Sequence, residues 1–243
     1  MLYTLTMKNN IIIAQKEIIN ILAGKLDDFY LAGGTALALF YFNHRQSDDL
    51  DFFTKEFNVT RVERIIGHLR ETTKKNITLI GENLSSQTAK VMVYNIELEK
   101  DEFLKIDFVE DFLPLIKATQ LFDRINVLSI EDIYLRKIYA VSGLGTKIDE
   151  IGRRQFSRGR QEAKDLFDIY FLSQRNFRLS DFVTKYCDQM LKEGVIRWFR
   201  TFNRLDMKTG LTEIKTENIV EFREIDKHLS NEIDRILLRE VDL

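Results

Sequence analysis

The sequence predicts an α+β protein, with a mixed sheet and flanking helices followed by a helical C-terminal region. Short segments of alternating polarity, rich in β-branched and aromatic residues, are concentrated before residue 125. Beyond that point apolar residues recur mainly at helical spacing. We therefore expect a core domain over residues 1–125 and a mostly helical region over residues 126–243, with no low-complexity linker to mark the boundary.

In the first half, helical spacing predicts helices over residues 11–26, 35–42 and 59–75. Apolar or alternating runs predict strands, which cover residues 29–32, 50–53, 77–80, 90–99 and 103–110. The only proline, Pro114, follows the last of these runs and suits the exit from a strand.

In the second half, Ser129 is a good N-cap for a helix that ends before Gly143. A basic segment punctuated by glycines follows, up to Gly159. Further helices are expected over residues 161–173, 180–192, 195–205 and 218–239.

The composition is that of an ordinary globular protein and excludes several classes. Of the 243 residues, 44% are hydrophobic and 30% are charged, which is enough to bury a core. A net charge of −2 gives no general attraction to nucleic acid or membranes, so any basic surface must be local. The single cysteine, Cys187, excludes an intramolecular disulfide and cysteine-rich zinc sites. We see no membrane-spanning run or signal peptide and expect a cytoplasmic protein.

Two adjacent glycines, Gly33 and Gly34, separate a predicted strand from a predicted helix. Glycines at such a position let a ligand approach the backbone, and the start of the helix offers free N–H groups to an anion such as phosphate. Thr35 can add a hydroxyl group. A tight turn without any ligand would explain the pair equally well.

Two carboxylates, Asp49 and Asp51, lie two residues apart on a predicted strand, so both point to the same face. They repel each other unless a cation lies between them, and oxygen ligands favour Mg²⁺ or Mn²⁺. A solvated edge strand is the alternative interpretation. The short distance in sequence from the glycine turn favours a joint metal and phosphate site, as phosphoryl chemistry requires.

These motifs resemble the AbiEii/AbiGii group of the nucleotidyltransferase superfamily, which includes toxins of abortive-infection and toxin–antitoxin systems. The upstream match is Gly33-Gly34-Thr35 followed by Arg45-x-Ser47-x-Asp49-Leu50-Asp51-Phe52. Downstream, Leu128-Ser129-Ile130-Glu131-Asp132 with Lys137, and Lys164-Asp165-Leu166-Phe167-Asp168 with Tyr170 and Leu172, are similar to two later motifs. The resemblance spans roughly residues 30–172, and the segment from Gly143 to Gly159 does not align.

The resemblance implies an Mg²⁺- or Mn²⁺-dependent nucleotidyltransferase that moves a nucleoside monophosphate from an NTP to an acceptor, with tRNA as one candidate. It implies metal ligands at Asp49 and Asp51, and a third carboxylate on a later strand. Asp107 is our candidate for that third group, as ligand or general base, with Glu97 and Glu110 as alternatives. The other implied binding residues are Gly33, Gly34, Thr35, Arg45, Ser47, Lys137 and Lys164, and Lys137 and Asp165 are also expected to be catalytic.

Three further interpretations stay open. The acceptor could be a small molecule or a protein, and the chain could be a non-catalytic relative that binds nucleotide or a partner protein. As a toxin it would be held by a separate antitoxin.

Lys137 stands on the apolar stripe of its predicted helix, so its ammonium group must snorkel, form an ion pair or face a cleft. Asp165 and Asp168 share a polar stripe with Lys164 on the next helix. That stripe is either a solvated face with a Lys164–Asp168 pair, or a functional face on which Asp165 orients Lys137 or a nucleotide.

Basic residues crowd into one predicted loop and could track an RNA backbone; they are Arg153, Arg154, Arg158 and Arg160. A plain solvated loop is the alternative. The histidines His44, His68 and His228 lack metal spacing, and His44 is expected at the surface.

Overall fold

The structure is a computed structural model that describes residues 2–99, 102–143, 146–148, 154–156 and 159–241. It consists of two compact units. Unit 1 comprises Met1–Asn43 and Ser47–Ile130, and unit 2 comprises His44–Gln46 and Glu131–Leu243. Residues 44–46 therefore belong to unit 2 although the chain on both sides of them belongs to unit 1.

Unit 1 is built on a seven-stranded mixed sheet with strand order β3-β4-β5-β2-β1-β7-β6. The strands are β1 (Tyr30–Ala32), β2 (Asp49–Thr54), β3 (Ile77–Asn83), β4 (Val91–Glu97), β5 (Phe103–Glu110), β6 (Gln120–Phe122) and β7 (Ile125–Val127). β2 lies near the middle, antiparallel to β1 and parallel to β5. This confirms the predicted α+β class with a mixed sheet.

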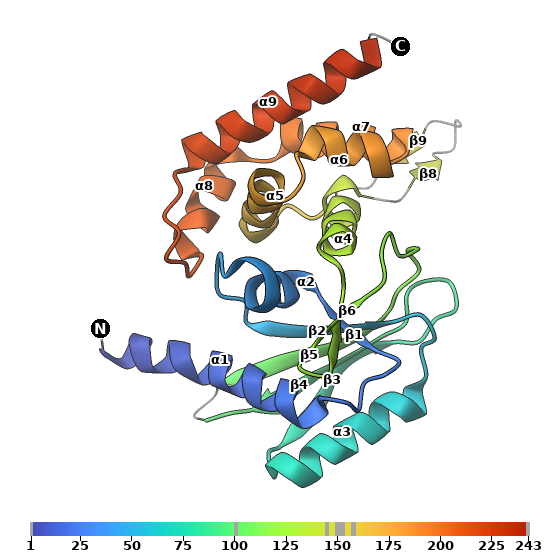
Figure 1. Cartoon of the computed structure of the whole chain (residues 1–243), viewed down its shortest axis with the longest axis vertical. Coiled ribbons are helices and arrows are strands. Elements are labelled where there is room, and N and C mark those ends of the chain that lie inside the picture. Colours follow the sequence, from blue (N-terminus) through green and yellow to red (C-terminus); the bar gives the residue numbers. More distant parts are fainter. Residues whose placement is uncertain (1, 100–101, 144–145, 149–153, 157–158, 242–243) are drawn as a thin grey trace. The chain divides into compact units, whose positions relative to one another are not determined.

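Helices cover both faces of this sheet (Figure 1). α1 (Leu2–Leu22) and α3 (Val59–Thr73) pack together on one face. On the other face, α2 (Gly33–Ala36) continues into a π-helical segment, η1 (Leu37–Phe42). Alternation along β2 sends Leu50 and Phe52 into the core, where Phe52 stacks on Phe108 with a centroid distance of 5.8 Å. Burial of each such side chain stabilises the fold by about 1.5–3 kcal/mol and fixes which face the intervening aspartates occupy.

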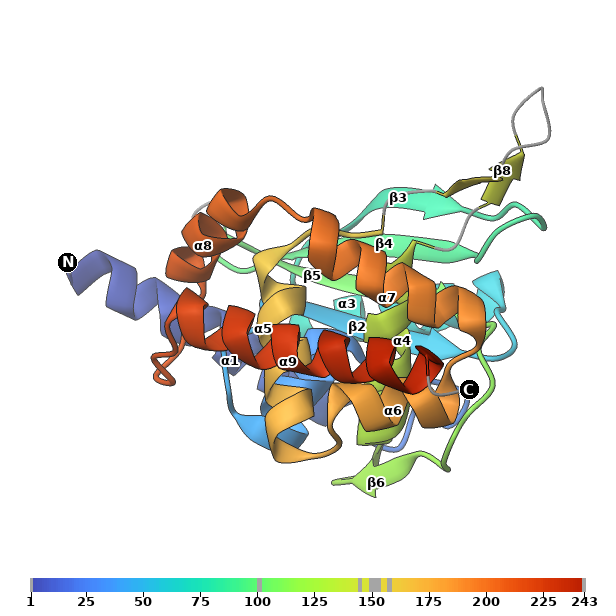
Figure 2. The same ribbon diagram turned by 90° about the horizontal axis from the view of Figure 1, so that it is seen from above.

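Unit 2 is mostly helical. Its helices are α4 (Ile130–Ser142), α5 (Ala163–Arg175), α6 (Leu179–Tyr186), α7 (Gln189–Thr201), α8 (Arg204–Glu213) and α9 (Phe222–Val241). A hairpin of β8 (Thr146–Ile148) and β9 (Arg154–Phe156) follows α4. α9 lies across α5, α6 and α7 (Figure 2). None of the helices in the described ranges is long and apolar enough to cross a membrane.

The structure corrects the expected helix over residues 180–192. α6 ends at Tyr186, and α7 begins only at Gln189 because the Asp188 side chain accepts a hydrogen bond from Leu191 N at 2.9 Å. The mid-run aspartate is therefore an N-cap. Asn203 caps α8, a helix that we did not predict, by accepting from Leu205 N at 3.0 Å. The short strands β6 to β9 were also missed.

Candidate active site

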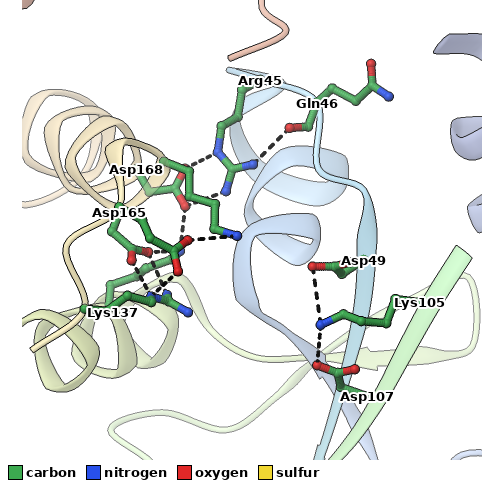
Figure 3. A network of polar contacts seen from close by, with 11 residues as sticks. Arg45, Gln46, Asp49, Lys105, Asp107, Lys137, Asp165 and Asp168 are labelled. Atoms are coloured by element: carbon green, nitrogen blue, oxygen red, sulfur yellow. Dashed lines mark hydrogen bonds and ion pairs between the residues drawn. The ribbon is translucent and has the colours of Figure 1, made fainter. Parts of the chain in front are cut away.

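Two adjacent strands of unit 1, β2 and β5, bring three carboxylates together, of which Asp49 and Asp107 are labelled in Figure 3. In the parallel register of β2 and β5, Asp51 lies beside Asp107, and Asp49 lies beside Lys105. Asp49 and Asp51 alternate with the buried Leu50, so both of their side chains point to the face of β2 opposite that of Leu50. We call Asp49, Asp51 and Asp107 the acid cluster.

Position 33 must be glycine because of its backbone conformation and its closeness to Asp51 of the acid cluster. Its φ of +68° is in the left-handed region, and a Cβ atom there would lie 3.0 Å from Asp51 Cγ and collide with the Asp51 carboxylate. Both facts require glycine at this position. The turn from β1 into α2 and the acid on β2 are therefore one structural unit, as the motif spacing suggested.

The predicted phosphate contact of the Thr35 hydroxyl needs correction. Thr35 is fully buried, and its hydroxyl donates to the backbone carbonyl of Asp49. Gln15 of α1 donates to the same carbonyl at 3.2 Å. The one hydroxyl proton of Thr35 is thus used to anchor the first residue of β2 rather than offered to a ligand.

Lys105 joins the acid cluster, and we did not anticipate it. Its Nζ lies 2.9 Å from Asp107 Oδ2 and 3.7 Å from Asp49 Oδ2 (Figure 3). Burial opposes the charge of Lys105, but the carboxylates of Asp107, Asp49 and Asp51 outweigh it and raise the lysine pKa. Burial also raises the pKa of Asp107, against the effect of Lys105. The signal was present in the sequence: a lysine two residues before an acid shares its face of the strand.

The acid cluster is suited in kind to a divalent metal. Carboxylate oxygens are the ligands that Mg²⁺ prefers, and Lys105 already places one positive charge between two of them. Asp107 Oδ1 is buried and has no hydrogen-bond partner among the described residues, which suits a further ligand. As they stand, no three acidic, histidine or cysteine side chains in the described ranges form a ready-made metal site. The residues that could hold the ion are Asp49, Asp51 and Asp107.

The alternatives for the third carboxylate lie at the ends of their strands. Glu97, at the end of β4, accepts a hydrogen bond from Asn76 at 3.2 Å. Glu110, at the end of β5, pairs with Lys90 at 3.3 Å. Only Asp107, of these three, is in register with Asp51.

Unit 2 contains a second cluster of charges, centred on the fully buried Asp168 of α5 (Figure 3). Arg45 binds Asp168 through two hydrogen bonds, from Nε at 2.6 Å and from Nη2 at 2.8 Å. Lys137 of α4 lies 2.7 Å from Asp168 Oδ2. Burial opposes the charge of Asp168, but Lys137 and Arg45 hold the pKa of this carboxyl well below its usual range. We call these groups, with His44, Asp165 and Arg160, the ion network.

Lys137 forms ion pairs rather than reaching to solvent. Its side chain is 7% exposed, and its Nζ lies 2.8 Å from Asp165 Oδ1 as well as close to Asp168. The snorkelling alternative is therefore wrong, and the expected contact between Asp165 and Lys137 is present. Burial opposes the ammonium charge, but the two aspartates outweigh it and raise the pKa of Lys137. Arg160 also donates to Asp165, from Nη2 to the same Oδ1 at 2.7 Å.

His44 is also part of the ion network, and its expected surface position is wrong. It is fully buried, with Nε2 2.7 Å from Asp168 Oδ1 and its ring stacked on Phe167. Burial lowers the pKa of His44 despite the opposing effect of Asp168. Nothing in its spacing marked this role, because its partner is 124 residues away along the chain.

The contacts described for Lys164 and Ser47 lie outside both clusters. Lys164 is exposed and pairs with Glu162 at 3.0 Å, so the alternative Lys164–Asp168 pair is wrong. Ser47 is half-buried, and its carbonyl accepts from Gln15. Arg154 belongs to β9, whereas Arg153 and Arg158 lie outside the described residues.

The chain matches the family model "Nucleotidyl transferase AbiEii toxin, Type IV TA system" over residues 20–239, and it belongs to that family.

Two solved structures and one curated relative resemble the chain. JHP933 from Helicobacter pylori has a TM-score of 0.57 at 16% identity, covering 97% of this chain and 95% of that protein. A candidate nucleotidyltransferase from H. pylori has a TM-score of 0.56 at 17% identity, covering 92% and 93%. At such identities these likenesses show the fold. An uncharacterized protein of Aquifex aeolicus (strain VF5) is 27% identical over 158 residues, which is 63% of this chain but only 61% of that relative's length.

Proposed function

We propose that this protein is a metal-dependent nucleotidyltransferase that moves a nucleoside monophosphate from an NTP to an acceptor hydroxyl and releases pyrophosphate. The observation that carries the proposal is the register of β2 and β5, which sets Asp107 beside Asp51. Asp51 of β2 also lies against Gly33 of the glycine turn. Membership of the AbiEii family supports the same reaction class.

In this proposal the acid cluster holds Mg²⁺ or Mn²⁺ through Asp49, Asp51 and Asp107. The metal, when bound, supplies positive charge that neutralises the phosphates of the NTP. Asp107 is the group that draws the proton from the accepting hydroxyl. The start of α2 offers the backbone N–H groups of Gly33 and Gly34 to the triphosphate, in keeping with a helix N-terminus as an anion site.

The roles proposed for unit 2 follow from its ion network. Asp165 orients the ammonium group of Lys137, consistent with their separation of 2.8 Å. Lys137 would neutralise phosphate charge by exchanging one of its two aspartate partners for a phosphate oxygen. The buried Arg45–Asp168 pair stabilises α5 against α4 through Lys137. We assign Arg45 to this positioning role rather than to direct nucleotide binding, because its Nε and Nη2 donate to Asp168 and its Nη1 donates to the carbonyl of Gln46. Ser47 and Lys164 remain candidate nucleotide-binding residues.

We further propose a toxin–antitoxin context, in line with the family description, and tRNA as the acceptor. Arg153, Arg154 and Arg158 would track the RNA backbone, with Arg160 contributing while it also binds Asp165. Neutralising the first three should make the slope of log affinity for RNA against log salt concentration less steep by about one per lost phosphate contact. The affinity for NTP should not change.

The test is transfer of label. The protein is incubated with Mg²⁺, total tRNA and each α-labelled NTP in turn, with the Asp49→Asn variant as the control. We expect labelled tRNA and free pyrophosphate with wild type and neither with the variant. Label on a protein or a small molecule would identify that molecule, instead of tRNA, as the acceptor. Failure to bind any NTP would favour a non-catalytic relative.

A further inference from the structure

Lys105 is the residue of the acid cluster to which the proposed function gives no role. It precedes Asp107 by two residues on β5, so both side chains emerge on the same face of the sheet. Its ammonium group lies between two carboxylates, 2.9 Å from Asp107 Oδ2 and 3.7 Å from Asp49 Oδ2 (Figure 3). A lysine in this position competes directly with a divalent cation for the same oxygen atoms.

Two further observations indicate that this lysine can be displaced. Its side chain is 37% exposed, so it can leave the carboxylates without unpacking the core. Lys105 bonds one oxygen of Asp107, while Oδ1 is buried without a hydrogen-bond partner in the described part of the chain. The carboxylate therefore has a buried acceptor that the lysine does not satisfy, and binding of a ligand to this oxygen would remove the cost of leaving it unpaired.

We propose that Lys105 is a displaceable cation that couples metal binding to nucleotide binding. In the empty protein it neutralises the acid cluster, which keeps the affinity for free metal low. A metal–triphosphate complex displaces it more easily than free metal does, because phosphate oxygens accept the released ammonium. The inference rests on the proposed function, and it adds a phosphate-binding residue that selects the metal–nucleotide complex over the free ion.

Two titrations by calorimetry test the coupling, one with Mn²⁺ alone and one with preformed Mn²⁺–tripolyphosphate, which carries the phosphates without a base. Lys105→Gln should bind Mn²⁺ alone at least about tenfold more tightly than wild type, since one competing charge near the surface is removed. The order should reverse for Mn²⁺–tripolyphosphate. Lys90→Gln is the matched control, because Lys90 is 32% exposed and pairs with Glu110 outside the acid cluster. It should bind both probes like wild type.

Lys105→Arg provides a second variant that keeps the charge and should retain the wild-type affinity for Mn²⁺ alone. Unchanged Mn²⁺ affinity in Lys105→Gln, together with loss of binding in Asp49→Asn, would overturn the role of Lys105 and leave the metal site intact. Absence of Mn²⁺ binding in wild type and in every variant would overturn the metal-dependent function itself. If Lys105→Gln bound both probes more tightly, the lysine would be a competitor but no phosphate ligand, and the coupling would be disproved.

Discussion

Asp51 and Asp107 are direct neighbours across the parallel pair of β2 and β5, although 56 residues separate them (107 − 51). Parallel pairing with β5 is what gives the acid pair a third carboxylate. The placement also predicts how the cluster responds to substitution.

Asp51→Asn should separate metal chemistry from folding. It removes one of three adjacent negative charges and nearly keeps the shape, so without ligands we expect a stability at least equal to wild type. With Mn²⁺ and an NTP at about 100 times its Kd, wild type should gain about 2.7 kcal/mol and the variant almost nothing. Nucleotide transfer should fall by a factor on the order of 10² or more. Thermal melts with and without ligand check this, with the exposed Asp48→Asn as the control. A lower melting temperature without ligand would instead assign Asp51 a structural role.

Gly33→Ala should destabilise unit 1 through both backbone and side chain. The left-handed φ costs a β-carbon-bearing residue about 1–2 kcal/mol, and the collision with the Asp51 carboxylate adds to it. In an Asp51→Ala background the second contribution should shrink, so urea melts of the double-mutant cycle should show coupling of at least about 0.5 kcal/mol. Gly81→Ala is the control, because a Cβ there meets no atom within 4 Å. Strict additivity would contradict the predicted contact.

Lys137→Met should lower the stability of unit 2 by about 3–5 kcal/mol, because it leaves two buried carboxylates without a shared cation. A lysine that faced a cleft would instead tolerate methionine without loss of stability. Lys164→Met is the matched control on α5, since Lys164 is exposed and pairs with Glu162. It should change the free energy of unfolding by less than about 1 kcal/mol. Urea denaturation of both variants makes the comparison, and equal effects would mean that the ion network adds no stability.

His44 should make unfolding pH-dependent. Burial lowers the pKa of His44 in the folded protein. The positive charges of Arg45 and Lys137 lower it further, and Asp168 raises it, but the net effect is a lowered pKa. The unfolded chain, with a histidine pKa of about 6.5, therefore takes up the proton first as the pH falls. The free energy of unfolding should decrease as the pH falls below about 6.5 and continue to do so until the folded-state pKa is reached.

His44→Gln should flatten this decrease between pH 7 and 5, measured as urea midpoints at each pH. His68→Gln of α3 is the control for removing a histidine that lies outside the ion network. His228, whose pKa burial also lowers, contributes in the same direction in all three proteins, so the difference between slopes isolates His44. An identical slope in His44→Gln and wild type would contradict the prediction.

The glycine turn and the pair Asp49 and Asp51 were predictable from sequence because their signals are local, whereas Asp107 joins them only through the pairing of β2 with β5. Gly33, Asp49 and Asp51 lie within one turn and one strand, and periodicity alone assigns the two acids to one face. The ion network was only partly predictable. Its partners are brought together by tertiary packing, with 123 residues between Arg45 and Asp168.

Errors in the fold follow the same division. The strong alternation of β5 gave both of its ends correctly, at Phe103 and Glu110. The break between α6 and α7 depends on Asp188 acting as a cap, and an aspartate inside an amphipathic run can equally be a solvated helical residue. The chemistry of that one side chain is local, but the choice between its two roles is made by packing.

The short excursion of residues His44–Gln46 into unit 2 bears on how the protein is made. A ribosome delivers Arg45 early, whereas the aspartate that it binds emerges more than 120 residues later. Unit 2 can therefore complete its buried charges only after most of the chain has been synthesised, while unit 1 can pair all seven of its strands before then. A C-terminal fragment that begins at Glu131 would also lack the guanidinium of Arg45 and bury Asp168 with less compensation. Unit 2 is thus discontinuous in the sequence, and a truncation at Glu131 would remove the part of it that contains Arg45.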